Sequence, residues 1–171
     1  FYDVPPYRVN PVSFASEILD ERKNRKFLGN LTADWNFYKP FTFQVNLGYT
    51  YNSIERNSYI SKSNLLGNGN GGYVSVQKLQ DYSRLLETIL KYNQKFGKHS
   101  IDAMLGYSYQ YFYDEGNHTR AYGFLSDTFK WYSLAAAKTV ESISSFAESN
   151  TLISMYGRIN YNYGDKYLFT A

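Results

Sequence analysis

The fold is decided by the stretch Phe41-Thr42-Phe43-Gln44-Val45-Asn46-Leu47-Gly48-Tyr49-Thr50-Tyr51-Asn52. Every odd position in this stretch is apolar or aromatic, and every even position is polar or glycine. Successive side chains of a β-strand point to opposite faces, whereas a helix repeats every 3.6 residues. The stretch therefore predicts a long strand with one apolar face and one polar face.

The same alternation recurs along the chain. Residues 101–113 follow it with Met104 and Phe112 as exceptions, and residues 153–163 follow it more loosely. Weaker strands precede the first two at 27–36 and 84–94, and another begins at 167–171. Residues 79–90 also fit helical spacing, but the strand from 99 needs a hairpin partner across the turn at 95–98. The sequence thus predicts six strands.

Short turns and long polar connections alternate between these strands. The turns at 37–40, 95–98 and 163–166 are short enough for β-hairpins. The polar stretches at about 1–23, 53–80 and 114–150 are unusually long for a compact domain, and 134–149 is predicted to hold a short helix. A transmembrane β-barrel has this asymmetry, with short periplasmic turns and long extracellular loops. We therefore expect an all-β chain that forms an antiparallel transmembrane β-barrel segment, with these three stretches as outer loops.

In a bilayer the apolar face of such strands contacts lipid and the polar face lines the lumen. Strands of this length exceed the usual globular length of about 5–6 residues, which favours the membrane over a soluble sheet with one wet face. Asp102 and Arg158 lie on the predicted lumen face, where they would pair with a plug or with each other. We expect both residues to have a structural role, and contact with the substrate is the alternative.

Composition narrows the remaining classes. The chain has 171 residues with 18 basic and 15 acidic groups, and 19% of its residues are aromatic, so it is neither disordered nor a nucleic-acid binder by charge. It has no cysteine, which excludes disulfides and thiolate metal sites. No apolar run approaches 18 residues, so no transmembrane helix is predicted.

Six strands cannot close a membrane barrel. The smallest bacterial barrels have about eight strands, and an open edge in lipid leaves backbone amides unpaired at several kcal/mol each. We therefore expect the chain to be one segment of a larger barrel.

Residues 154–168, Ser-Met-Tyr-Gly-Arg-Ile-Asn-Tyr-Asn-Tyr-Gly-Asp-Lys-Tyr-Leu, resemble the strand-turn-strand signature of SusC-like (RagA-like) TonB-dependent outer-membrane transporters of Bacteroidota. Three other pieces appear in the family's order. They are Asn10-Pro11-Val12 leading to Leu28-Gly29-Asn30, the stretch 92–100, and the stretch 105–110.

The resemblance implies a barrel of 22 strands in the outer membrane of a Gram-negative bacterium, with an N-terminal plug and a TonB box that this stretch does not contain. It further implies active import of oligosaccharides or peptides with a SusD-like surface lipoprotein, energised by the TonB-ExbB-ExbD complex acting on the plug. No cofactor is implied, and the expected partners are outer-membrane lipid and the glycan or peptide substrate, not nucleic acid.

Aromatic residues in the predicted outer loops are the candidate ligand contacts, because aromatic rings stack on sugars and pack against peptides. The alternative role of such rings is packing between loops or against a lid. These candidates are Tyr59, Tyr73, Tyr122, Trp131 and Tyr132.

Bond chemistry has little support in the sequence. His99, Ser100 and Asp102 lie at a hairpin and on a strand with little freedom to form a relay, and His118 lacks enough neighbouring ligands for a metal site. The glycine-rich stretch 67–72 lacks the Lys-Ser/Thr ending of a phosphate loop. We therefore expect no enzyme, no catalytic residue and no metal. The alternatives left open are an outer-membrane β-barrel hydrolase and a soluble carbohydrate-binding β-sandwich.

Overall fold

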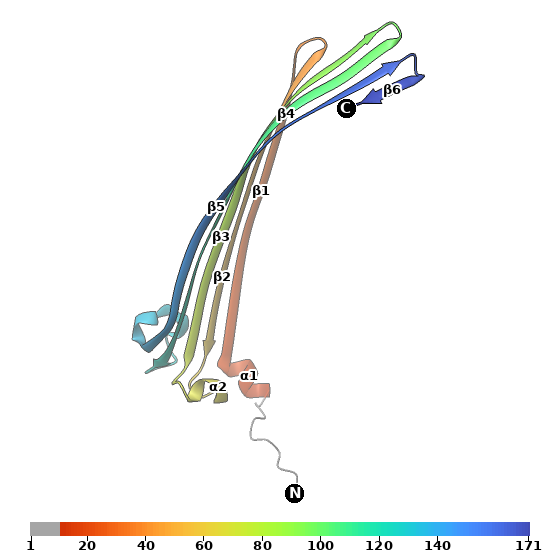
Figure 1. The fold of residues 1–171 in the computed structure, drawn as a ribbon. Helices are drawn as coiled ribbons and strands as arrows, with labels where there is room; N and C mark the ends of the chain where they lie inside the picture. Colours follow the sequence, from red (N-terminus) through yellow and green to blue (C-terminus); the bar gives the residue numbers. More distant parts are fainter. Residues whose placement is uncertain (1–10) are drawn as a thin grey trace. The chain divides into compact units, whose positions relative to one another are not determined.

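The structure is a computed structural model that describes residues 11–171. Six strands form a single sheet in which each strand pairs with its neighbours in chain order (Figure 1). The strands are β1 (Ile18–Tyr38), β2 (Phe41–Ile60), β3 (Tyr73–Phe96), β4 (His99–Phe124), β5 (Ala137–Tyr163) and β6 (Tyr167–Thr170). The six predicted strands and the antiparallel all-β fold are confirmed.

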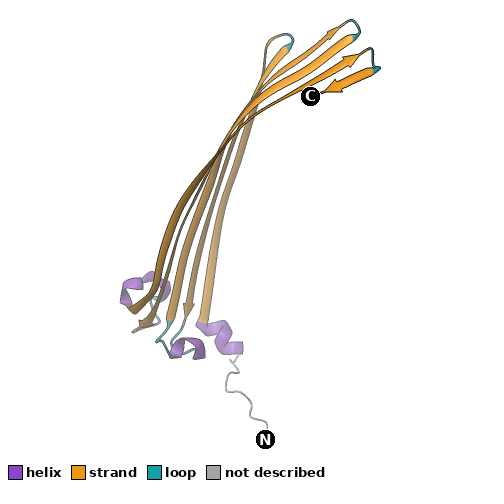
Figure 2. Cartoon of the chain, viewed as in Figure 1, coloured by secondary structure: helices purple, strands orange, loops and turns teal. Residues whose placement is uncertain are grey.

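The helices are short and lie outside the strands (Figure 2). They are α1 (Pro11–Glu17), α2 (Leu65–Asn68) and the 3-10 turns η1 (Lys130–Tyr132) and η2 (Leu134–Ala136). Among the residues that the structure describes, no helix is long and apolar enough to cross a membrane. The helix predicted at 134–149 is wrong beyond Ala136, because β5 begins at Ala137 and pairing with β4 extends the chain there.

All three predicted short turns are present. The β5–β6 hairpin pairs Tyr163 with Tyr167, and both Gly164 and Asp165 have positive φ angles of 57° and 59°. Such angles match the right-handed twist of the flanking strands in a tight hairpin. The side chain of Asn162 accepts from the backbone N–H of Asp165 at 3.0 Å and donates to its carboxylate at 2.8 Å, which fixes this turn.

The strands are longer than the sequence predicts. Much of the predicted loops at 53–80 and 114–150 is strand, and only 61–72 and 125–136 connect β2 to β3 and β4 to β5. Within the predicted loop 1–23, residues 18–23 belong to β1, and residues 1–10 lie outside the described residues. The alternation of polarity is lost where both faces of a strand are polar, although the backbone pairs as before. The helical spacing at 79–90 is likewise overridden, since all of it lies in β3.

Two compact units divide the described residues. Unit 1 comprises residues 11–25, 52–80 and 114–147, and unit 2 comprises residues 26–51, 81–113 and 148–171. Unit 2 contains all of the strongly alternating stretches found in the sequence.

Buried apolar side chains are found in unit 1. Its small core consists of Tyr59, Val74, Ala121 and Phe124, against which Leu19, Val76, Trp131, Leu134 and Ala137 pack. Among the described residues, no hydrophobic side chain of unit 2 is buried. Unit 2 instead exposes large apolar side chains, with Leu105 at 64% and Met155 at 80% of their full accessible surface. A sheet of this kind needs a non-aqueous environment on its apolar face.

Candidate functional site

One aromatic girdle lies on the apolar face of unit 2, toward the long connections in the sequence. The ring centroid of Tyr82 lies 6.5 Å from that of Tyr49, 6.1 Å from that of Tyr111 and 5.1 Å from that of Tyr113. The guanidinium carbon of Arg84 lies 5.1 Å from the ring centroid of Tyr82. Tyrosine and arginine together are typical of the membrane interface, where amphipathic rings meet headgroups.

A second aromatic girdle lies beside the short turns. Phe41 contacts Tyr92 at 5.0 Å and Phe37 at 6.2 Å between ring centroids, and His99 lies 4.8 Å from Tyr163. Along β2, Phe41 and Tyr49 of the two girdles are eight residues apart, about 27 Å of extended chain. The nine residues from Phe41 to Tyr49 are close to the roughly 9–11 residues with which a tilted strand crosses the apolar core of a bilayer.

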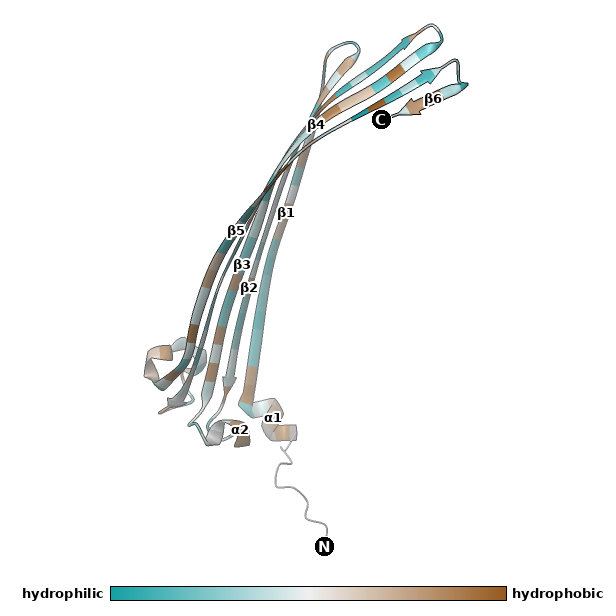
Figure 3. Ribbon diagram, viewed as in Figure 1, coloured by the Kyte–Doolittle hydropathy of each residue, from teal (hydrophilic) through white to brown (hydrophobic). Residues whose placement is uncertain are grey.

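Between the girdles, apolar and polar residues are interleaved along β4 and β5 (Figure 3). Leu105 of β4 and Ile159 of β5 expose 64% and 52% of their surfaces on the apolar face. An exposed apolar band with an aromatic rim at each end is what a lipid-facing wall requires.

The opposite face of unit 2 carries a hydrogen-bonded polar network. Glu87 of β3 accepts from the Tyr156 hydroxyl at 2.7 Å and from the Asn46 amide at 3.4 Å. Asn46 in turn accepts from the Thr32 hydroxyl at 3.1 Å. These bonds join β1, β2, β3 and β5, so the network stabilises the register of the sheet while leaving its surface polar.

Asp102 joins three strands on this polar face. Its two carboxylate oxygens accept from the side-chain amides of Asn93 on β3 and Asn160 on β5, each at 3.2 Å. Arg158 lies on β5 and is exposed. No ion pair links Asp102 to Arg158 in the part of the chain that the structure describes. Two neutral amides therefore partner Asp102, and a lumenal role for both residues remains a prediction.

Glycines let bulky side chains cross the polar face. A Cβ atom at Gly106 would lie 2.3 Å from two ring carbons of Tyr156, and one at Gly48 would lie 3.2 Å from Cβ of Leu85. In unit 1, a Cβ at Gly116 would lie 2.7 Å from the Phe146 ring. Each large side chain covers a backbone segment that has no side chain of its own, a pairing that pins strand register.

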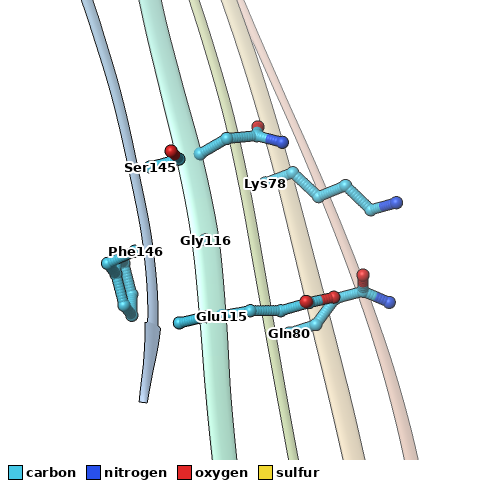
Figure 4. A pocket seen from close by; sticks show the side chains of 8 residues that line it. Lys78, Gln80, Glu115, Gly116, Ser145 and Phe146 are labelled. Carbon is cyan, nitrogen blue, oxygen red and sulfur yellow. The ribbon is translucent and has the colours of Figure 1, made fainter.

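Unit 1 has polar side chains where a lipid-facing wall would have apolar ones. Figure 4 shows Lys78, Gln80 and Glu115 projecting to one side of the sheet and Phe146 to the other. Lys78, Gln80 and Glu115 line a hollow of about 460 Å³. A lysine, a glutamine and a glutamate on one face favour contact with water, so we infer that the lipid-facing band is confined to unit 2.

All five predicted ligand-binding aromatics lie in unit 1, and three of them, Tyr59, Trp131 and Tyr132, lie in or beside its core. Tyr59 is only 2% exposed and packs in the core. Trp131 packs against the same core, and Tyr132, 77% exposed, lies 5.7 Å from its ring. The Tyr73 hydroxyl donates to Glu141 at 2.9 Å, and Tyr122 is partly exposed on β4. Binding by these residues remains a prediction, and Tyr132 is the most accessible of them.

A polar latch holds the connection 125–136 against the connection that follows β2. The carboxylate of Asp127 accepts from the Tyr59 hydroxyl, from the Ser61 hydroxyl at 2.8 Å and from the Lys62 backbone N–H at 3.4 Å. Lys62 also donates to the carbonyl of Leu125 at 2.9 Å. We call Tyr59, Ser61, Lys62 and Asp127 the latch. No sequence motif predicts the latch, because Asp127 lies 68 residues away from Tyr59 in the chain.

The latch shifts the pKa values of Asp127 and Tyr59. Burial by itself raises the pKa of Asp127, but hydrogen bonds from Tyr59, Ser61 and the Lys62 N–H outweigh it and hold that pKa below its usual value. Burial, with the hydrogen bond to the Asp127 carboxylate, raises the pKa of the Tyr59 hydroxyl well above its ordinary value. The latch is therefore strongest with a charged Asp127 and a neutral Tyr59.

Unit 1 also contains a polar hollow of about 450 Å³ that no sequence motif predicts. We call it the basic hollow, and its lining includes Arg56, Tyr73, Ser75, Gln77, His118 and Arg120. Among the described residues, no cluster of three or more histidine, cysteine, aspartate or glutamate side chains could hold a metal ion.

The chain was compared with known proteins. No family model matches it. It is 30% identical to TonB-dependent receptor P3 of Formosa agariphila over 161 residues, which cover 94% of this chain and 16% of that receptor. It is 26% identical over 163 residues to TonB-dependent receptor SusC of Bacteroides thetaiotaomicron, again with 94% and 16% covered. The resemblance to SusC-like TonB-dependent receptors is thereby confirmed.

Solved structures agree on the fold of this chain. The RagAB peptide transporter matches with a TM-score of 0.78 and 18% identity, covering 89% of this chain and 17% of that one. The RagAB peptide importer in its open-open state also gives a TM-score of 0.78, at 19% identity over 92% of this chain and 18% of that one. The antiparallel transmembrane β-barrel segment is therefore confirmed. The chain spans about a sixth of the length of the curated relatives it matches.

Proposed function

We propose that this segment forms part of the barrel wall of an active importer in the outer membrane of a Gram-negative bacterium. The observation that carries the proposal is the pair of faces in unit 2. An exposed apolar band between two aromatic girdles suits lipid, and the network around Glu87 and Asp102 suits an aqueous lumen. Relatives named TonB-dependent receptors support this assignment.

The whole protein would take up oligosaccharides or peptides together with a SusD-like surface lipoprotein. Energy would come from the TonB-ExbB-ExbD complex acting through a plug and TonB box outside these 171 residues. The structural neighbours are named as a peptide transporter and a peptide importer, which supports peptide as one cargo class. The wall itself would perform no bond chemistry.

The test uses the full-length receptor in its own cell. Strains that lack the receptor, or that lack TonB, are supplied with mixed oligosaccharides or mixed peptides as the sole growth source. We expect both strains to lose uptake of the same cargo class and the purified receptor to retain a lipoprotein in detergent. Uptake that survives TonB deletion, or a receptor that hydrolyses the supplied cargo, would overturn the proposal.

A further inference from the structure

The basic hollow is built by three neighbouring strands. Arg56 comes from β2, the residues Tyr73, Ser75 and Gln77 alternate along β3, and His118 and Arg120 alternate along β4. Alternate residues of a strand share a face, so one face of the sheet presents all these side chains. They occupy odd positions of β3 and even positions of β4.

Two guanidinium groups in the basic hollow differ in how they are neutralised. Arg56 donates to Asp20 through Nε at 3.0 Å and Nη2 at 2.6 Å, so its charge is largely matched. Arg120 is exposed, and no ion pair joins it to a carboxylate within residues 11–171. Arg120 therefore offers a planar fork of donors to a ligand.

Other polar side chains in the basic hollow can form hydrogen bonds to a ligand that the Arg120 guanidinium holds. Nε2 of His118 and the Ser75 hydroxyl lie 2.8 Å apart, and the Gln77 amide lines the same hollow. The nearby carboxylate of Glu141 is occupied by the Tyr73 hydroxyl at 2.9 Å and is not part of the lining. No carboxylate from the described residues 11–171 lines the basic hollow, so this lining is cationic and rich in donors.

We propose that the basic hollow binds a carboxylate of the transported ligand through Arg120, with His118 and Gln77 as supporting hydrogen-bond partners. A guanidinium binds a carboxylate with two parallel hydrogen bonds, which gives both affinity and orientation. Such a carboxylate is carried by a uronate-containing oligosaccharide or by an acidic peptide. The inference rests on the proposed function and narrows its cargo to anionic ligands.

The experiment measures binding by calorimetry to the purified full-length receptor in detergent. The probes are trigalacturonate and its neutral methyl ester, and triglutamate and triglutamine. Arg120→Gln removes the fork. Lys78→Gln is the matched control, because Lys78 alternates with Ser75 and Gln77 along β3 and its loss removes one positive charge from the opposite face of that strand. We expect one acidic probe to bind the natural protein, and Arg120→Gln to weaken it about tenfold or more with Lys78→Gln unchanged within about twofold.

The possible results distinguish failure of the proposed carboxylate site from failure of the proposed import function. Equal weakening in both variants would mean diffuse charge attraction and would overturn the site, as would equal binding of acidic and neutral probes or binding of neither acidic probe. Correct folding of each variant is checked by its heat-modifiable migration on a gel. A receptor that binds an acidic probe through Arg120 but imports nothing would refute the proposed function and leave the site intact.

Discussion

The ring of Tyr156 lies directly over the backbone of Gly106, where a Cβ atom would lie 2.3 Å from two ring carbons. The Tyr156 hydroxyl reaches Glu87 at 2.7 Å from this position. Because Gly106 on β4 has no side chain, Tyr156 on β5 can reach across β4 and donate a hydrogen bond to the Glu87 carboxylate on β3.

Gly106→Ala is therefore expected to displace Tyr156 and to destabilise the barrel by about 1–3 kcal/mol, the usual range for overpacking. Heat-modifiable gel migration of the full-length receptor measures the loss as a lower unfolding temperature. Gly157→Ala is the matched control, because its nearest heavy atoms lie 3.5 and 3.8 Å from the new Cβ. Equal effects of the two substitutions would contradict the packing argument.

Leu105→Arg is expected to impair insertion into the outer membrane. Leu105 is 64% exposed on the apolar face, and an arginine near the bilayer midplane costs about 2–4 kcal/mol there. Ser108→Arg, on the polar face of the same strand, serves as the control and should insert normally. The amount of heat-modifiable receptor in outer-membrane fractions reports the difference, and normal insertion of Leu105→Arg would count against lipid contact.

Tyr59→Phe should loosen the connection 125–136 without unfolding the barrel. The substitution removes a hydrogen bond to the charged Asp127, and bonds of this kind contribute about 1.5–3 kcal/mol. Hydrogen exchange of residues 125–136 should quicken by about tenfold or more. Tyr132→Phe alters an exposed hydroxyl and should leave exchange unchanged, so similar effects of both variants would refute the latch.

Acid should open the latch. The pKa of Asp127 is depressed in the folded state, so its stabilising effect is present above the unfolded pKa near 3.8 and is lost as pH falls through the lower folded value. Hydrogen exchange of residues 125–136, corrected for intrinsic rates, should accelerate over that window. In Asp127→Asn the step should vanish, and a step that persists there would assign it to another group.

At alkaline pH the latch is expected to weaken as pH rises, because the Tyr59 hydroxyl loses its proton. The folded-state pKa of Tyr59 is raised above its unfolded value of 10.0, so the neutral hydroxyl stabilises the latch below that pH. Protection of residues 125–136 should fall as pH rises above 10. The Tyr59→Phe variant should lack this fall, and an unchanged profile would show that the hydroxyl does not matter.

Much of the wall could be predicted from the sequence. The alternation from Phe41 to Asn52 and the turn around Gly164 are local signals, because side-chain direction and hairpin geometry depend on neighbouring residues. The extensions at 53–60 and 137–150 could not be predicted in this way. Where both faces of a strand are polar, the sequence shows no period of two, although the neighbouring strand continues the backbone pairing.

The sequence by itself determined which strands exist, where they turn sharply and which face is apolar. Only the tertiary structure decided that Tyr59 is a buried member of the latch, that Asp102 bridges Asn93 and Asn160, and that Arg56 and Arg120 line one basic hollow. The physical reason is the separation in sequence between the residues that contact one another. Alternation and turns are set by contacts within a few residues, whereas these groups meet through strand pairing between segments up to 68 residues apart.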